Sequence, residues 1–484
     1  MSWTATTRRG IRRHWPMLVL VLAGAALRAV VTVGFRPVLW YLGDSISYLS
    51  MAVGGPAYPW RPQGYSFLLL ILRPLHHLAA VAVVQHGLGL AVGVLIYAVC
   101  LRVGLRRWVA TLAAVPVLFD AWEVTTEQYL LSETFFIVLL TVALAALVWW
   151  QPRRPPPAWA AGLAGLLVGL AADVRTICLF LIVPVVAVLL LRRARVLRTV
   201  LAAVLFGVPL VAYAGFFDSQ FGWFGISPTG LFAYGRVSGF ASCAGVSLSP
   251  DEQQLCPTSA EEKMGTDFFL WDPRSPFHQL PGSLAHQNSV GEAFAIKMVE
   301  HHPGDYLHAV WEDFQTEFSP DRAPSAYDVT PTYATLPALA QVLANHYQGA
   351  GNGQTHPTPG IERWFAWYQR HGFMPGVAFL VGLALAAAGV VFGRDEPATG
   401  LRSATVGFGL AAAILLLVPP FVASFDYRYL VPALPPLCVA AATGATLLAN
   451  RVSALARRRA RAGAHFPGSP PVDGELSGEA VLVT

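Results

Sequence analysis

Residues 80–101 read AVAVVQHGLGLAVGVLIYAVCL and contain no Asp, Glu, Lys or Arg. A run of roughly 20 mostly apolar residues is long enough to cross the hydrocarbon core of a bilayer as a helix. Similar runs occupy residues 16–34, 108–120, 132–150, 158–172, 174–191, 199–217, 376–392, 403–423 and 429–449. The sequence therefore predicts an all-α integral membrane protein, a bundle of about 10 transmembrane helices (10 to 11) with additional juxtamembrane helices.

The composition supports this prediction. Of the 484 residues, 55% are hydrophobic and only 13% are charged, and the mean hydropathy is +0.51. Soluble domains carry about 25% charged residues. Arg residues occur in short clusters between long uncharged runs, a distribution that excludes a disordered chain, a coiled coil and a nucleic-acid binder with one basic face. The net charge of +5 therefore needs a topological explanation.

The positions of the Arg clusters predict the topology. They lie near residues 8–13, 102–107, 153–154, 192–198, 394–402 and 451–461. All of them fall on one side if the apolar run 64–78, which contains Arg73 and Pro74, is a juxtamembrane or re-entrant helix and not a span. Because cytoplasmic loops carry an excess of Lys and Arg, we expect a multi-pass plasma-membrane protein with both termini in the cytoplasm.

Four segments follow from this topology. Residues 1–217 form an N-terminal transmembrane module whose first outer loop is 35–79, residues 218–372 form an extracytoplasmic domain, 373–450 are C-terminal spans, and 451–484 are a basic, then disordered, cytoplasmic tail. The extracytoplasmic segment contains sixteen Asp and Glu but seven Lys and Arg. Helices are expected near 290–301, 305–318, 336–346 and 361–371; the last carries Trp364, Trp367 and Tyr368 and should lie on the membrane surface.

The positions of the five cysteines are consistent with the predicted topology. Cys243 and Cys256 both lie in the extracytoplasmic segment, where an oxidising compartment lets thiols pair. We predict a disulfide between them. Cys100, Cys178 and Cys438 fall in predicted spans and are interpreted as small apolar residues. No cysteine spacing is typical of a metal site.

Ionisable residues at the outer ends of spans are the candidates for chemistry, because burying such groups is costly unless they pair or function. The first outer loop contains WYLGDSISY at 40–48 and YPWRPQGY at 58–65. Glu127, Glu133, Asp173 and Arg175 follow at later outer span ends, and 426–429 reads DYRY before the last span. Arg28 lies inside the first span, where it either snorkels outward or faces an active-site cavity; we expect it to snorkel.

Several of these segments resemble the GT-C glycosyltransferases, the membrane enzymes that include protein O-mannosyltransferases and lipid A aminoarabinose transferases. The resemblance rests on Asp44 after the first span, RPQGY at 61–65, LSE at 131–133 and RYLVPALP at 428–435. It covers about residues 8–215 and 376–450. Protein O-mannosyltransferases carry an Asp-Glu pair after the first span, whereas Ser45 follows Asp44 here. This departure makes a protein acceptor less favoured.

The resemblance implies an inverting transfer of a sugar, mannose or an arabinose-type pentose, from a polyprenyl-phosphate donor to an acceptor hydroxyl on the extracytoplasmic face. Asp44 would be the general base. The residues implied for binding the donor phosphate or sugar are Arg428, Arg61, Arg175 and Tyr427; those implied for the acceptor or as a second carboxylate are Glu133, Glu127 and Tyr48. The acceptor stays open among glycan, lipid, natural product and protein.

Structural explanations exist for the same residues. Asp44 is also a possible N-cap for a helix that begins at Ser45. Arg428 is equally explained by pairing with Asp426 or by anchoring the last span, and Asp173 by pairing with Arg175. We expect no required cofactor, with a divalent metal as the less favoured alternative, and no nucleic-acid partner. The rival functions are a multi-span transporter or lipid flippase, and a non-catalytic scaffold.

Overall fold

The structure is a computed structural model that describes residues 3–151, 154–322, 328–329, 336–394 and 400–463. Nearly all elements are helical. In the N-terminal half they are α1 (Trp3–Gly34), α2 (Leu42–Ala52), α3 (Gly64–Leu72), η1 (Arg73–Leu75), α4 (Leu78–Arg102), α5 (Arg107–Phe119), α6 (Ala121–Gln128), α7 (Glu133–Val148), α8 (Ala158–Ala172), η2 (Thr176–Leu181), α9 (Ile182–Leu191) and α10 (Val196–Phe221).

The second half contains the outer segment and the last spans. Its elements are α11 (Thr229–Val237), α12 (Pro250–Gln254), η3 (Glu262–Met264), α13 (Thr266–Trp271), α14 (Pro276–Gln279), α15 (Leu284–His301), α16 (Pro303–Glu317), α17 (Ala338–Gln348), α18 (Pro359–His371), α19 (Gly376–Phe392), α20 (Leu401–Leu417), α21 (Pro419–Val422), η5 (Tyr427–Tyr429) and α22 (Leu430–Gly463). The strands β1 (Phe35–Arg36) and β2 (His356–Pro357) form a short antiparallel pair.

The apolar helices confirm a helical membrane protein. Five helices within the described residues are long and apolar enough to cross a membrane, and seven if two bent pairs are each one span. The bent pairs are α5–α6, with a 48° bend, and α18–α19, with a 46° bend. Shorter apolar helices at 133–148, 158–172 and 176–191 coincide with further predicted spans. The count of ten spans stays a prediction.

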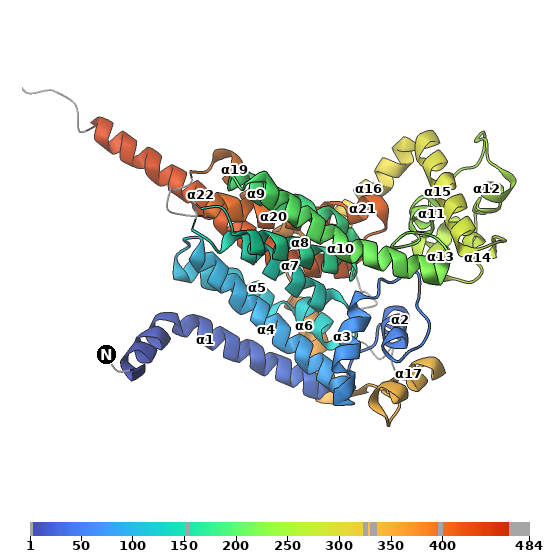
Figure 1. Cartoon of the computed structure of the whole chain (residues 1–484), viewed down its shortest axis with the longest axis horizontal. Helices are drawn as coiled ribbons and strands as arrows, with labels where there is room; N and C mark the ends of the chain where they lie inside the picture. The colour runs from blue at the N-terminus through green and yellow to red at the C-terminus, as the bar shows by residue number, and fades with distance from the viewer. Residues whose placement is uncertain (1–2, 152–153, 323–327, 330–335, 395–399, 464–484) are drawn as a thin grey trace, which may run out of the picture.

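The run predicted to lie outside the spans is a short helix. The nine residues of α3 rise about 14 Å, roughly half the thickness of a bilayer core. Figure 1 shows α1 and the end of α22 leaving the same end of the bundle, opposite to α11–α15. Both observations favour the predicted topology.

Small residues let neighbouring spans approach closely. A Cβ atom added to Gly165 of α8 would lie 2.0 Å from the carbonyl oxygen of Ala202 in α10. Any side chain there would separate the two helices. This use of glycine is typical of transmembrane packing, where close backbone approach replaces the hydrophobic effect between helices.

The predicted extracytoplasmic segment divides between two hydrophobic cores. Residues of α11–α15 form a separate core that includes Tyr234, Phe277 and Phe294, and Cys243 and Cys256 form a disulfide beside it. In contrast, α17 and α18 contribute Tyr347 and Phe365 to the core of the transmembrane helices. We call residues 229–301 the outer domain. The helix bounds agree with all four helices predicted in this segment.

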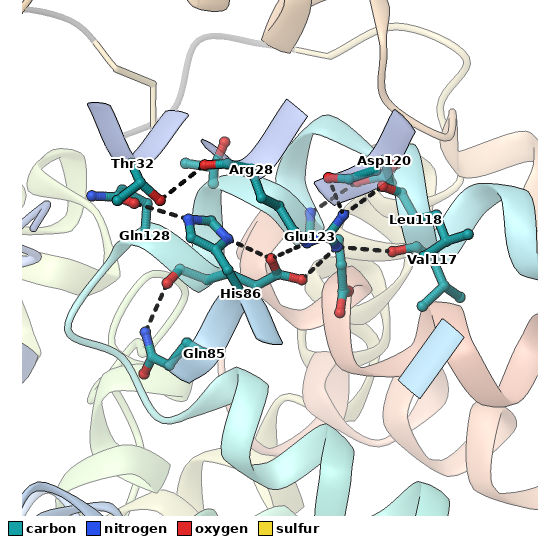
Figure 2. Close-up of polar contacts among 12 residues, drawn as sticks. Arg28, Thr32, Gln85, His86, Val117, Leu118, Asp120, Glu123 and Gln128 are labelled. Atoms are coloured by element: carbon teal, nitrogen blue, oxygen red, sulfur yellow. Dashed lines mark hydrogen bonds and ion pairs between the residues drawn. The ribbon is translucent and has the colours of Figure 1, made fainter. Parts of the chain in front are cut away.

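A buried ionic cluster joins α1, α4 and α6. Arg28 is 2% exposed and donates from Nε and Nη2 to the two carboxylate oxygens of Glu127, both at 2.7 Å. His86 Nδ1 lies 2.7 Å from Glu127 Oε2, and Arg28 also donates to the carbonyl oxygen of Leu118. Figure 2 shows Arg28 and His86 pointing toward one another within the cluster. The prediction that Arg28 snorkels outward is wrong, because its counter-ion lies inside the bundle.

Glycine makes room for this cluster. A Cβ atom on Gly89 of α4 would lie 1.7 Å from Glu127 Oε1. Glu123, one turn before Glu127, is equally buried, and neither of its carboxylate oxygens has a hydrogen-bond partner within the described ranges. The bundle therefore holds Glu127 in one position, and its carboxylate is fully occupied by Arg28 and His86.

Glu127→Gln should destabilise the folded protein by roughly 3–5 kcal/mol, because it leaves the Arg28 guanidinium buried without its counter-charge. Thermal unfolding of the detergent-solubilised protein measures the change. Asp272→Asn, which removes the partner of the exposed Arg274, is the matched control and should leave the unfolding temperature unchanged. Equal unfolding temperatures for both variants would contradict this role of the cluster.

Candidate active site

The first outer loop is fixed by backbone hydrogen bonds to the segment between α6 and α7. Leu39 N donates to Gln128 O at 3.0 Å, and Leu130 N donates to Leu39 O at 3.0 Å. Ser45 Oγ donates to the carbonyl oxygen of Leu130, and Gln128 Nε2 donates to that of Phe35. Since His86 Nε2 also contacts Gln128 Oε1 at 2.9 Å, the buried ionic cluster and the loop form one continuous network.

This loop places Asp44 between two guanidinium groups. Asp44 lies in the first turn of α2, after the N-cap residue Tyr41, so it is not the N-cap. Arg61 Nε donates to Asp44 Oδ1 at 2.7 Å, and Arg428 Nη1 donates to Asp44 Oδ2 at 2.7 Å. Asp44 and Arg428 are 384 residues apart in sequence. The structure therefore brings together the residue that the resemblance implied as the base and one that it implied for the donor phosphate.

The two arginines control the ionisation of Asp44. Burial alone would raise the pKa of this carboxyl group, but the charges and hydrogen bonds of Arg61 and Arg428 outweigh burial and lower the pKa to about 2. Asp44 is therefore fully ionised at neutral pH. Arg428 also approaches Asp426, at 3.4 Å between Nε and Oδ2, so the pairing proposed as a structural explanation is present in addition to the contact with Asp44.

These side chains line a cavity of about 700 Å³, a size typical of ligand sites. Its polar lining includes Asp44, Tyr48, Arg61, Arg175, Arg428, Tyr429 and, from the outer domain and α16, Arg236, Glu292, Glu300 and Tyr306. Its apolar lining comes from η2, from the outer ends of α20 and α21, and from α11 and α15. One cavity thus connects the first loop, the transmembrane helices and the outer domain.

Arg175 and Tyr48 are held at the cavity wall by neighbouring residues. Arg175 forms a buried ion pair with Glu133, and its guanidinium lies over the ring of Tyr429 at 5.5 Å. Tyr48 donates to Ser132 Oγ at 3.1 Å. Glu133 itself is buried behind Arg175 and does not line the cavity. Its contact with Arg175 replaces the predicted pairing of Asp173 with Arg175.

Two predicted site residues lie elsewhere. Glu127 contacts Arg28 and His86 in the buried ionic cluster, because α6 directs its carboxylate toward α1 and α4. Tyr427 lines a separate small pocket together with Trp122 and Arg322. The structure therefore brings neither side chain to the cavity. Arg428, the residue after Tyr427, does line it.

The contribution of the outer domain to the cavity was not predicted from the sequence. Trp271 of α13 lies 4.8 Å from the Arg61 guanidinium carbon, measured to the ring centroid, and Arg236, Glu292 and Glu300 line the cavity. The helical spacing of residues 229, 232, 233, 236 and 237 was the available signal. It indicates a helix face but not what that face covers.

No group of three or more His, Cys, Asp or Glu side chains that could hold a metal ion occurs within residues 3–151, 154–322, 328–329, 336–394 and 400–463. The donors that surround Asp44 are cations. They supply positive charge to the site.

Asp173 lies beside the site, between α8 and η2, and is 8% exposed. Its carbonyl oxygen accepts from Gly64 N at 2.8 Å, so it ties α3 to the end of α8. Within the part of the chain that the structure describes, its Oδ1 atom has no hydrogen-bond partner. Burial raises the pKa of Asp173 to about 7.

Asp173→Asn should stabilise the protein more at pH 8 than at pH 5. With a pKa of about 7 in the folded state and 3.8 ordinarily, the folded state binds more protons between these values, so the wild type loses stability as pH rises through this window. Unfolding temperatures should show a gain for the variant that grows by about 2 °C or more between the two pH values. Asp218→Asn, a change of an exposed aspartate, is measured alongside. A gain for Asp173→Asn that is no larger at pH 8 than at pH 5 would refute the assignment.

Comparison with known proteins gives three findings. Residues 78–222 match the family model for dolichyl-phosphate-mannose-protein mannosyltransferases. No curated protein matches the chain. Among solved structures, the archaeal oligosaccharyltransferase AglB from Archaeoglobus fulgidus, in complex with an inhibitory peptide and a dolichol-phosphate, is similar over 98% of this chain with 12% identity and a TM-score of 0.42.

This chain covers 53% of the AglB chain, about half its length. The family match falls on α4 to α10, the helices that carry Glu133 and Arg175. Residues 78–222 are thus similar to the dolichyl-phosphate-mannose-protein mannosyltransferase family, over part of the segment for which the sequence predicted a GT-C resemblance.

Proposed function

We propose that the chain is an inverting glycosyltransferase that moves a sugar from a polyprenyl-phosphate donor to an acceptor hydroxyl on the extracytoplasmic face of the membrane. The observation that carries this proposal is the position of Asp44, a buried carboxylate held between Arg61 and Arg428 at the wall of a large cavity. A base and cations in one cavity are what transfer from an anionic donor requires.

The cations are the proposed site for the donor phosphate. Arg61, Arg175 and Arg428 all line the cavity, and guanidinium groups form strong, charge-assisted hydrogen bonds with phosphate oxygens. The apolar lining next to them includes Ile177, Phe180 and Val422. Phe180 and Val422 are 48% exposed each. We place the polyprenyl tail along these side chains, where it continues into the lipid.

In the proposed reaction, the acceptor oxygen attacks the anomeric carbon and Asp44 takes the acceptor proton. The bond between the anomeric carbon and the phosphate oxygen breaks, and polyprenyl phosphate leaves with the electron pair. The negative charge of the leaving phosphate grows during this step, and the guanidinium groups of Arg428, Arg61 and Arg175 stabilise it. Attack from the face opposite to the leaving group inverts the configuration.

Donor binding would also prepare the base. While both guanidinium groups contact Asp44, its pKa of about 2 makes it a weak base. A bound phosphate competes for the same N–H groups and adds a negative charge nearby, and both effects raise a carboxyl pKa. Asp44 thus becomes a stronger base only when a donor occupies the cavity, which protects the donor-free enzyme from unproductive protonation.

We propose mannose as the first sugar to test, because the family that matches residues 78–222 uses dolichyl-phosphate-mannose; an arabinose-type pentose is the second. A transporter or lipid flippase is the alternative function, and it would not release polyprenyl phosphate from the donor. The decisive assay therefore mixes purified protein, polyprenyl-phosphate mannose and candidate acceptors, and measures released polyprenyl phosphate. Absence of release with every sugar would refute the proposal.

Asp44→Asn should lower kcat by about 10²- to 10⁴-fold, because the amide cannot accept the acceptor proton. The release assay measures this loss. Asp426→Asn is the matched control, since it removes another carboxylate that contacts Arg428 but does not line the cavity; it should retain most of the activity. Unfolding temperatures of both variants show whether the fold is intact, and a fully active Asp44→Asn would exclude a general-base role.

The pH profile should report the change in the base. The acid limb of kcat, which reflects the enzyme with bound donor, should lie at higher pH than the acid limb of kcat/KM, which reflects the free enzyme. In Arg428→Gln one guanidinium is absent, so the acid limb of kcat/KM should move to higher pH as well. Superimposable profiles for wild type and Arg428→Gln would show that Arg428 does not set the ionisation of Asp44.

A further inference from the structure

The outer domain presents two helix faces to the cavity. Residues 229, 232, 233, 236 and 237 of α11 and residues 292, 295, 296, 299 and 300 of α15 all line it. Both sets have the spacing of a single helix face. The helices pack closely, because a Cβ atom on Gly230 would lie 1.8 Å from the carbonyl oxygen of Asn288, whose side chain also accepts from Gly230 N. The wall is therefore a fixed surface and not a mobile loop.

Most of this wall is apolar. Its centre consists of Phe232, Ala233, Val237, Ala295, Ile296 and Val299. The single aromatic ring among these six side chains is Phe232, so the wall offers little of the aromatic stacking surface expected for a polysaccharide. It matches an acceptor whose non-reacting part is aliphatic. The proposed function places the donor tail on a different part of the cavity lining, along η2 and α21.

One arginine interrupts the apolar wall. Arg236 is 8% exposed, and its Nη1 donates to Asp313 Oδ2 at 2.7 Å. Its Nε and Nη2 atoms are buried and have no acceptor among the described residues, so a small rotation of the side chain would turn them toward the cavity that Arg236 lines. Buried N–H groups of a charged side chain are costly to leave unpaired. A ligand oxygen that enters the cavity beside Arg236 would remove this cost.

The ends of the wall carry negative charge, in contrast to its apolar centre and to Arg236. Glu292 and Glu300 lie at the two ends of the α15 face and are exposed. Carboxylates accept hydrogen bonds from hydroxyl groups, whereas they repel a second anion. The wall therefore has one place for an acidic group, at Arg236, and hydrogen-bond acceptors for hydroxyl groups at its ends.

We propose that α11 and α15 form the acceptor subsite and that it binds a lipid-like acceptor with an aliphatic body and one acidic group, a carboxylate or a phosphate, held by Arg236. The inference rests on the proposed function in that it names the acceptor class of the same cavity. The acidic group is a recognition element. The reacting hydroxyl group of the same molecule would lie toward Asp44, at the opposite wall.

The test uses probes that need no donor. Three twelve-carbon chains that each carry a photoreactive diazirine end in a carboxylate, a phosphate or a neutral alcohol. The purified full chain is irradiated with each probe, and mass spectrometry measures labelling of residues 229–237 and 292–300 against probe concentration. At least one acidic probe should label these segments at roughly 10-fold lower concentration than the alcohol. Comparison of the two acids identifies the preferred group.

Variants locate the acidic contact. Arg236→Gln should raise the half-saturating concentration of the acidic probe by roughly 10-fold or more and leave the alcohol unchanged. Asp313→Asn should lower it, because Nη1 of Arg236 is released for the ligand. Arg274→Gln, a change of an exposed arginine in the same domain, is the matched control and should have no effect. If Arg236→Gln does not fold, Ala233→Trp, which fills the wall without altering charge, should abolish labelling by all probes.

Polyprenyl phosphate separates the acceptor subsite from the donor site. Labelling at α11 and α15 should persist when polyprenyl phosphate is added, because the donor phosphate is placed at Arg428 and not at Arg236. Loss of labelling by competition would assign the wall to the donor and overturn the inference. Equal labelling by acid and alcohol with no effect of Arg236→Gln would also overturn it. The release assay on the same preparation decides the proposed function independently.

Discussion

The bidentate contact between Arg28 and Glu127 is the constraint on which the site depends. It ties the first span to α6, and the neighbouring residue Gln128 holds the first outer loop through Phe35 and Leu39. A charge pair inside a bundle is costly to desolvate, so its geometry must be exact enough to recover that cost. The position of Asp44 depends on this network as well, because Asp44 directly precedes Ser45, whose side chain donates to the carbonyl oxygen of Leu130.

Charge balance at Asp44 follows the same logic. The carboxylate is buried, yet burial does not neutralise it, because guanidinium groups from two distant parts of the chain contact both of its oxygens. In the absence of substrate, the carboxylate of Asp44 and the guanidinium groups of Arg61 and Arg428 therefore neutralise each other's charge and pair each other's hydrogen-bonding atoms. An anionic ligand can enter such a site by exchanging one set of contacts for another, so that no buried charge is left unpaired at any stage.

The sequence was sufficient for the helical membrane fold and for the four helices of segment 218–372, because these follow from hydrophobic run length and periodicity. The proximity of Asp44 and Arg428 followed from the resemblance to the GT-C glycosyltransferases, which implied that both residues belong to one site. The sequence was not sufficient to predict which charged side chains form ion pairs with each other. Arg28, Glu127 and Glu133 each had several plausible partners by position, and only packing selects among them. The contribution of the outer domain to the cavity could not be predicted for the same reason. Helical spacing in a single sequence indicates that a face exists, but not which surface that face contacts.

The separate core of residues 229–301 makes this module structurally independent of the membrane core. This module carries its own aromatic interior and disulfide, while the segments that follow it, α17 and α18, belong to the membrane core and brace the first loop. Remodelling of the module would leave the contacts of Asp44 with Arg61 and Arg428 in place, while the wall that the module contributes to the cavity would change. One side of the cavity can therefore vary in shape and polarity independently of the carboxylate and guanidinium groups on the other side.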